Sequence, residues 1–405
     1  MRNDLPPGDL PEGWTWRRLG SICEFQKGTK PRVIYEDPRE NCLPYILIES
    51  FDGIYKKFTD DETCPQCEQD DILMVWDGAR AGLCAIGLEG YIGSTLCALR
   101  PKPIIDPHFL YRFLSFHYED LNRNVRGVGI PHLKRDSLES LPVPVPPLLE
   151  QRLIVVRVEA LLDRVRSVTE KLENVSQTMM KRFREAILKQ AFSGALTAEW
   201  RENQHRPNGW AQMKLGQLVE LSNERVNPKE LPDEPYIGLA HIEPHTTKIK
   251  APGRAAEVSS TKTRFRKGDI LYGKLRPYLN KVCIPDFDGI CSTDILVFSC
   301  GPGMVNRYLL RLLTTRKFVA YAHQHMSGVQ HPRVSFDQLA RFPVPLPPVP
   351  EQQEIVDRVE ELFNFADTVE QRVEEAKSRV EQLTQSVLAR AFRGELSADF
   401  RQAQS

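Results

Sequence analysis

The sequence predicts an α+β protein built as a tandem pseudo-twofold repeat, with two globular α+β domains separated by two long heptad helices that form an antiparallel coiled coil. Three observations predict this fold class. The chain of 405 residues is too long for one ordinary core. A proline-rich stretch, "LPVPVPPLLEQRLIVVRV" at 141–158, recurs as "FPVPLPPVPEQQEIVDRV" at 342–359. A heptad pattern of apolar residues follows each copy.

The repeat extends over the whole chain. "PEGWTWRRLG" at 11–20 corresponds to "PNGWAQMKLG" at 207–216, and "DILMVWDGAR" at 71–80 to "DILYGKLRPY" at 269–278. "AFSGALTAEWR" at 191–201 corresponds to "AFRGELSADFR" at 391–401. A period near 200 residues is too long for a solenoid, so each half is a domain plus an arm. The predicted domains are a first globular domain at 1–141, a hinge and long helix at 142–206, a second globular domain at 207–342, and a second hinge and helix at 343–405.

Each globular segment mixes short β-like runs with one helix-like run before the hinge. The β-like runs include "YILI" from Tyr45, "DILMVW" from Asp71 and "DILVFS" from Asp294. The helix-like runs are "HFLYRFLSFHYEDLN" and "RYLLRLLTTRKFVAYAH", whose leucine and aromatic content is typical of a core face. These patterns predict α+β domains without fixing a strand order.

The repeated proline-rich stretch predicts a rigid joint between domain and helix. Alternating prolines favour extended backbone that ends before the helix begins. Glu150-Gln151 and Glu351-Gln352 then start the two helices, where their carboxylates favour the positive end of the helix dipole.

Each arm carries a narrow apolar seam in which spacings of four and three alternate. At about 1.5 Å per residue, some 40 helical residues would span roughly 60 Å. The first arm has one residue more than the second between the shared "EQ" and "AF", which predicts irregular pairing near the exits. The seam residues are Ile154, Val158, Leu161, Val165, Val168, Leu172, Ile355, Val359, Leu362, Val369, Val373 and Val380.

Composition and missing motifs restrict the function. Lys and Arg total 54 against 54 Asp and Glu, so any basic surface must be local. No apolar stretch reaches the length of a membrane span, and we expect a cytoplasmic protein. The sequence has no phosphate-binding loop, dinucleotide-binding turn, zinc-protease helix or nucleophile elbow. These absences predict a protein without catalytic residues.

The nine cysteines favour reduced thiols. Cys64 and Cys67 form one C-x-x-C, which could belong to a zinc site, but the second ligand pair that makes this signal strong is missing. Loop thiols are the favoured interpretation, and we expect no metal.

Local basic clusters with interleaved aromatic residues indicate nucleic-acid binding, with a solvated basic face as the alternative. Glycines flank the loops near 132 and 331, so backbone could approach a phosphate there while side chains reach base edges. The candidates in the first domain are Lys27, Lys30, Arg32, Arg80, Arg126, His132, Lys134 and Arg135. Those in the second domain are Arg264, Arg266, Lys267, Lys274, Arg276, Tyr278, Lys281, Gln330, His331 and Arg333.

The two joints "PVPVPPLLEQ" and "PVPLPPVPEQ", the two "GW-x4-LG" starts and the two "AF-x-G-x-L" exits resemble the specificity (S) subunit of type I restriction-modification systems. The resemblance implies a non-catalytic subunit with two target recognition domains, each reading one half of a split double-stranded DNA sequence. It also implies docking of two methyltransferase subunits and, through them, of restriction subunits. S-adenosylmethionine, ATP and Mg²⁺ would then be cofactors of the partners and not of this chain.

Two other classes remain open from the residues alone. The chain could be a coiled-coil scaffold whose domains bind protein rather than DNA. It could also be a nuclease or methyltransferase with an unrecognised motif, although the missing signatures weigh against this.

Overall fold

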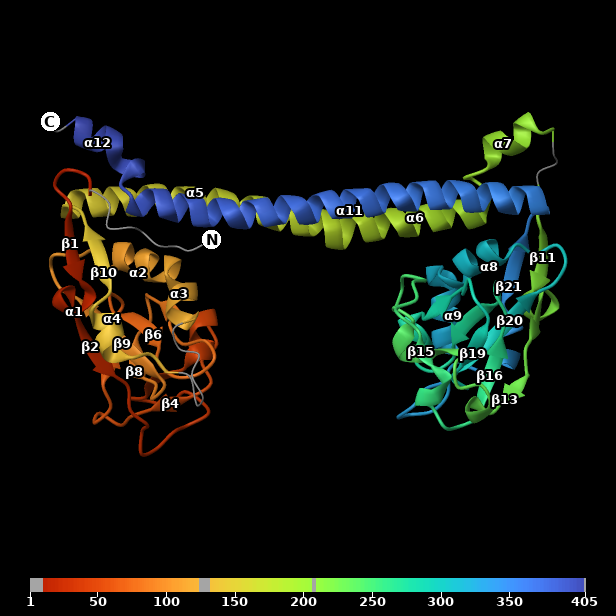
Figure 1. Ribbon diagram of the computed structural model, residues 1–405, viewed down its shortest axis with the longest axis horizontal. Coiled ribbons are helices and arrows are strands. Elements are labelled where there is room, and N and C mark those ends of the chain that lie inside the picture. The colour runs from red at the N-terminus through yellow and green to blue at the C-terminus, as the bar shows by residue number, and fades with distance from the viewer. Residues whose placement is uncertain (1–9, 124–131, 206–208, 404–405) are drawn as a thin grey trace. The chain divides into compact units, whose positions relative to one another are not determined.

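The computed structural model describes residues 10–123, 132–205 and 209–403 (Figure 1). The chain forms two compact units. The first contains residues 1–172 and 375–405, and the second contains residues 173–374. Each unit therefore holds one globular domain and parts of both long arms.

The first globular domain contains two four-stranded sheets. One has the order β2-β9-β6-β7, formed by β2 (Cys23–Lys27), β9 (Leu96–Pro101), β6 (Ile72–Val75) and β7 (Cys84–Ala85). The other has the order β4-β3-β8-β5, formed by β4 (Phe58–Thr59), β3 (Leu43–Ile46), β8 (Gly90–Ile92) and β5 (Gln66–Cys67). Strands β3 and β8 are parallel, whereas the other pairs are antiparallel.

The second globular domain has the same plan. Its first sheet has the order β12-β20-β17-β18, formed by β12 (Val219–Leu221), β20 (Ile295–Cys300), β17 (Ile270–Gly273) and β18 (Val282–Cys283). Its second sheet, β13-β16-β19-β14-β15, is formed by β13 (Arg225–Val226), β16 (Lys262–Phe265), β19 (Gly289–Cys291), β14 (Pro235–Ile237) and β15 (Gly253–Arg254). Here too the pair β14 and β19 is parallel. The mixed sheets and helices confirm the α+β prediction.

The prediction of one helix before each hinge was too simple. The first run forms α2 (Pro107–Phe116) and α3 (Tyr118–Arg123), and the second forms α8 (Asn306–Leu313) and α9 (Arg316–Gln324). Thr315 starts α9 because its hydroxyl accepts a hydrogen bond from the Phe318 amide at 3.3 Å. Three shorter helices also lie in these domains: α1 (Leu19–Ile22), α4 (Arg135–Glu139) and α10 (Phe336–Leu339).

The repeated proline-rich stretch forms one strand of a two-stranded ribbon in each unit. Strand β10 (Pro142–Val145) pairs antiparallel with β1 (Thr15–Arg18), and β21 (Pro343–Leu346) pairs with β11 (Ala211–Lys214). Prolines occupy alternate positions, where a missing amide hydrogen does not interrupt the ladder of an edge strand. In Figure 1 the ribbon β1–β10 leads from the first globular domain to the start of α5.

The Gln of each "EQ" clamps its helix to the globular domain. The Gln151 side chain accepts from the Asp106 amide at 2.6 Å and donates to the carbonyl oxygens of Ile104 and Pro146. Gln352 accepts from the Val305 amide at 2.8 Å and donates to Gly303 and Pro347 in the same way. Both glutamines are buried, so each joint is stiffened by fully used side-chain amide groups.

The Glu of each "EQ" lies in the first turn of its long helix, as predicted, and it also belongs to a buried ion-pair cluster that the sequence did not reveal. Glu351 is 1% exposed and binds Arg201 and Thr197 in the second unit. In the first unit, Glu150 binds Arg401 and Ser397. Each arginine also donates to a glycine carbonyl at the exit of the preceding long helix. The repeated "EQ", "AF-x-G" and "WR" or "FR" segments therefore build one joint per unit.

The long arms are α5 (Leu148–Asn174), α6 (Met180–Ser193) and α11 (Val349–Phe392), and each exit continues into a short helix, α7 (Ala198–Asn203) or α12 (Ala398–Gln402). In the first unit, Ile154 and Val158 of α5 share a core with Phe392 of α11. In the second unit, Leu188 of α6 shares a core with Val359 of α11. The seam is not uniformly buried, since Val168 is 44% exposed.

The extra residue of the first arm is absorbed in the middle of the arm and not near its exit. Residues Val175–Met179 form a single π-helical turn between α5 and α6. A π turn accommodates one additional residue without ending the helix. The predicted irregularity thus exists, but its predicted place was wrong.

The cysteines are mostly core residues. Cys64 and Cys67 are buried, and the Cys67 thiol donates to the carbonyl oxygens of Leu88 and Gly90. Burial raises the pKa of Cys67 to about 12. The expectation of loop thiols was wrong for Cys67, which lies in strand β5, and correct for Cys64, which lies in the bend before this strand. None of the described helices is long and apolar enough to cross a membrane.

Candidate nucleic-acid interface

A cavity of about 600 Å³ opens beside the first sheet of the first domain. Its walls come from β2, β9 and the residue after β6, and from the loop that leads into α4 together with the first turn of that helix. That loop is attached to the sheet because the Leu133 amide donates to the Trp76 carbonyl at 3.0 Å, next to a bridge between Asp77 and His132. The lining residues are Phe25, Lys27, Trp76, Cys97, His132, Leu133, Lys134, Arg135, Asp136 and Ser137.

The lining of this cavity is cationic and aromatic. The Lys27 ammonium lies 5.5 Å from the centre of the Trp76 ring and pairs with Asp77 at 2.7 Å. The Arg135 guanidinium lies 5.8 Å from the Phe25 ring and pairs with Glu139 at 2.6 Å. Both pairs are partly exposed and therefore weak, so the cations can exchange these carboxylates for a phosphate at little cost.

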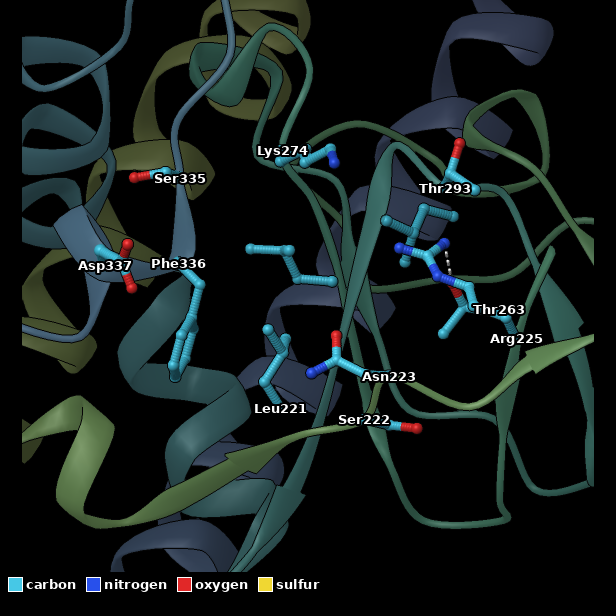
Figure 2. Close-up of a pocket in the computed structure, with 12 residues that line it drawn as sticks. Leu221, Ser222, Asn223, Arg225, Thr263, Lys274, Thr293, Ser335, Phe336 and Asp337 are labelled. Atoms are coloured by element: carbon cyan, nitrogen blue, oxygen red, sulfur yellow. Dashed lines mark hydrogen bonds between the residues drawn. The ribbon is translucent and has the colours of Figure 1, made fainter. Parts of the chain in front are cut away.

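The second domain has a cavity of about 310 Å³ beside its own first sheet. Figure 2 shows Asn223 and Lys274 at this hollow, with Phe336 on one side and Arg225 on the other. Arg225 donates to the Thr263 hydroxyl at 3.0 Å. The lining residues are Leu221, Ser222, Asn223, Arg225, Thr263, Lys274, Thr293, Ile295, Leu296, Ser335, Phe336 and Asp337.

The two cavities occupy equivalent places. Val75 pairs with Leu96 in the first domain, as Gly273 pairs with Ile295 in the second. The next residues, Trp76 and Lys274, therefore correspond, and each accepts a backbone hydrogen bond from the returning loop. By the same register Phe25 corresponds to Leu221, Lys27 to Asn223, and Arg135 to Phe336. One backbone frame thus carries two different sets of side chains.

The predicted residues of the first domain divide into two groups. Lys27, His132, Lys134 and Arg135 are brought together around the cavity. Lys30, Arg32 and Arg80 are exposed but do not line it. Arg126 lies outside the described residues.

Several predicted residues of the second domain are bound to acidic groups from distant parts of the sequence. Arg264 pairs with Glu224 at 3.1 Å and with Glu234 at 3.4 Å. Arg266 approaches Glu224 at 3.6 Å and Asp288 at 3.8 Å. The local excess of basic residues in the sequence is therefore reduced by the fold.

Two lysines in this region differ in exposure. Lys267 is exposed, whereas the Lys281 ammonium donates to the carbonyl of Leu239. Partial burial lowers the pKa of Lys281.

Arg333, Gln330, His331 and Tyr278 of the second domain do not line the cavity. Arg333 binds Asp294 at 2.9 Å, and this hydrogen bond raises the pKa of Arg333. Gln330 and His331 are exposed, and Tyr278 is 39% exposed with its ring 6.0 Å from that of His323. Of the predicted residues in this domain, Lys274 lines the cavity directly.

Sequence reasoning missed the aromatic and neutral residues of the two linings. Phe25, Trp76, Asn223 and Phe336 carry no charge, so a search for basic clusters could not select them. Aligning the two repeats position by position around "DILMVW" and "DILYGK" would have placed Trp76 opposite Lys274.

The arrangement supplies binding groups. Within residues 10–123, 132–205 and 209–403, no group of three His, Cys, Asp or Glu side chains is placed to hold a metal ion. The cavities instead offer cations for phosphates, amide and hydroxyl groups for base edges, and aromatic faces for stacking. The fold and these two sites define a tandem-repeat protein with a cavity at the same place in each globular domain.

The family is established by comparison with known proteins. The type I restriction modification DNA specificity domain matches this chain twice, over residues 11–177 and 207–378. The chain belongs to this family, which implies recognition of a DNA target.

Known relatives match over nearly the whole chain. The type I restriction enzyme EcoDI specificity subunit of Escherichia coli is 32% identical, with 98% of this chain and 92% of that protein covered. The StySPI specificity subunit of Salmonella potsdam is 28% identical, with 97% and 91% covered. The relatives are named as specificity subunits, which are non-catalytic, and this confirms that the chain is not itself an enzyme.

Solved structures share the fold. A chain from a structure on complex assembly and conformational transition of the type I R-M system aligns with a TM-score of 0.73 at 20% identity. It covers 96% of this chain and 100% of the other. The HsdS subunit from Thermoanaerobacter tengcongensis aligns with a TM-score of 0.58 at 21% identity, covering 96% and 98%.

Proposed function

We propose that this chain reads a bipartite, asymmetric DNA sequence, with one globular domain on each half-site. The observation that carries this proposal is the pair of equivalent cavities with different linings. Equivalent frames would dock on DNA in equivalent ways, whereas Trp76 in one and Lys274 in the other would select different bases. The two halves of the target should therefore differ in sequence.

The long helices would set the distance between the half-sites. Half-site spacing in dimeric DNA-binding proteins follows from the geometry of the element that joins their reading heads. We infer that the arms pair as an antiparallel coiled coil along their length, supported by the shared cores of α5 with α11 and of α6 with α11. The buried Gln and Glu clusters would keep each domain fixed on its arm.

We further propose that the arms dock two methyltransferase subunits, and restriction subunits through them. Glu360 and Asp367 pair with Arg307 and Arg184. Helix α11 nevertheless carries ten acidic residues against five basic ones, so it would suit a basic partner surface. In this proposal S-adenosylmethionine, ATP and Mg²⁺ belong to the partner subunits. The assembly would act in the cytoplasm, where its DNA lies.

Selection of bound sequences tests this function. The chain, co-expressed with its methyltransferase partner, is incubated with a random duplex pool at about 150 mM salt, which keeps phosphate binding from masking specificity. We expect two short, unlike motifs at one fixed separation. No motif despite stable assembly with the partner would contradict the proposal and favour a protein-binding scaffold.

A further inference from the structure

Arg276 follows β17 at the rim of the second cavity and adopts a left-handed backbone conformation, with φ +50° and ψ +61°. This conformation is unfavourable for a residue with a Cβ atom, and it is more so before a proline. Pro277 follows directly. The structure therefore holds Arg276 in a strained conformation, which is a feature that clusters at functional sites.

Backbone hydrogen bonds hold this conformation in place. The Arg276 amide donates to the Pro332 carbonyl at 2.8 Å, and the Leu279 amide donates to the Arg276 carbonyl at 2.9 Å. Two residues earlier, the Lys274 amide donates to the Asp294 carbonyl, and the Lys274 carbonyl accepts from the Val334 amide. The turn is thus fastened to both the sheet and the loop that closes the cavity.

The Arg276 side chain is exposed, and across the described ranges no hydrogen bond or ion pair engages its guanidinium. Its neighbours differ in this respect, because Arg333 is bound to Asp294 and Arg264 to Glu224. The strained backbone therefore does not serve a contact of this side chain within the described chain. It fixes the position of the Arg276 Cα atom, from which an unpaired guanidinium extends beside the cavity.

The equivalent turn of the first domain shows which residue this backbone conformation favours. Gly78 occupies the equivalent position, two residues after Trp76, and its φ is +109°. Glycine adopts positive φ without steric cost. A glycine would satisfy the turn in the second domain as well, so the fold alone does not account for an arginine there.

We propose that Arg276 is a specificity-determining residue that contacts a guanine in the half-site read by the second domain. A guanidinium is the side chain best suited to bind guanine O6 and N7 with two parallel hydrogen bonds in the major groove. Preorganisation by the fastened turn lowers the entropy cost of this contact. Gly78 leaves the first domain without the corresponding contact. This inference rests on the proposed function, since it names the base that one domain reads.

The test compares Arg276→Gly with Arg276→Gln in the chain co-purified with its methyltransferase partner. Arg276→Gly relieves the backbone strain and removes the guanidinium. Arg276→Gln keeps the backbone strain and removes only the bidentate contact to guanine. His245→Gly is the matched control, because His245 also has a positive φ, +63°, but lies outside the cavity lining. Sequence selection and thermal unfolding are measured for all four proteins.

We expect both Arg276 variants to lose preference for one guanine in the second motif by roughly 5- to 150-fold, while the first motif stays unchanged. The unfolding midpoint of Arg276→Gly should equal or exceed that of the wild type. The midpoint of His245→Gly should do the same, and His245→Gly should still select both motifs. Provided that the wild-type protein selects a two-part motif, two outcomes overturn the inference. One is an unchanged second motif in Arg276→Gly, and the other is unfolding of both Arg276 variants. Loss of the wild-type motif pair itself would instead count against the proposed function.

Discussion

The joints of the two units are alike at almost every residue, whereas the cavities of the two domains differ at almost every residue. Glu351 with Arg201 and Thr197 matches Glu150 with Arg401 and Ser397. In the cavities, by contrast, Lys27, Trp76 and Arg135 of the first domain correspond to Asn223, Lys274 and Phe336 of the second. Each joint attaches a globular domain to a long helix in the same geometry, so the two joints use the same types of residue. The residues that line a cavity can change without disturbing the strands beneath them.

The largest expected effect comes from breaking a joint. Glu351→Gln removes the buried charge that binds Arg201, which is itself 8% exposed. Breaking one partner of a buried pair costs about 3–5 kcal/mol of unfolding free energy. Denaturant unfolding of the variant should show this loss.

The matched variant Glu150→Gln sharpens the comparison. The Arg401 side chain is 22% exposed, against 10% for Arg201, so water can partly replace the lost carboxylate. We expect a smaller loss, roughly 1–3 kcal/mol. Equal losses in both variants would show that the two joints are energetically the same despite their different exposure.

A second prediction uses the tryptophan of each joint. The Trp210 indole donates to Glu351 at 3.2 Å, whereas the buried Trp14 indole nitrogen has no hydrogen-bond partner in the described structure. Trp210→Phe should therefore cost about 1.5–3 kcal/mol more than Trp14→Phe, because a hydrogen bond to a charged group is lost only in the former. Both variants remove the same volume, so the difference in unfolding free energy reports the lost Trp210 bond together with the removal of the unpaired Trp14 indole N–H. A difference near zero would mean that the Trp210 bond contributes nothing net.

Much of the architecture could be predicted from the sequence because repetition and heptads act over long stretches. The two domains, the proline-rich joints and the long helices all leave periodic or repeated signals. The role of Glu150 and Glu351 could not be predicted, because their partners Arg401 and Arg201 lie 150 or more residues away in sequence. The helix-start rule placed both glutamates in the first turn correctly, but a local rule cannot identify partners that are distant in sequence.

The cavities show the same limit. Charge patterns selected Lys27, Lys134 and Lys274, which line the cavities, but also Arg264, whose charge is compensated by Glu224 and Glu234. Whether an acidic residue neutralises a basic one depends on which strands become neighbours, and the strand order could not be predicted from the sequence. The strain at Arg276 was equally invisible, since a left-handed φ in a non-glycine residue has no composition signal.

The smallest expected effect is a pH dependence confined to the first unit. There Arg157 binds Asp399 of α12 through two hydrogen bonds, of 2.5 and 2.8 Å, and this lowers the pKa of Asp399 from 3.8 to about 2. In the second unit the equivalent of Arg157 is Arg358, which pairs instead with Glu354 in its own helix at 2.6 Å. The residue equivalent to Asp399 is Glu199 of α7. The ion pair that attaches the short exit helix to the long helix in the first unit is therefore not repeated in the second unit.

A lowered folded-state pKa means that the contribution of Asp399 is complete above its unfolded value of about 4 and disappears as the pH falls through about 2. The unfolding midpoint of the wild type should therefore fall toward that of Asp399→Asn between pH 4 and pH 2, and the two should coincide at the lower end. Other carboxylates titrate in the same range, so the difference between the two proteins is the quantity to follow. A pH-independent difference for Asp399→Asn would show that the Arg157 pair does not persist in solution, and the first unit would then hold its exit helix through the buried Glu150 cluster alone.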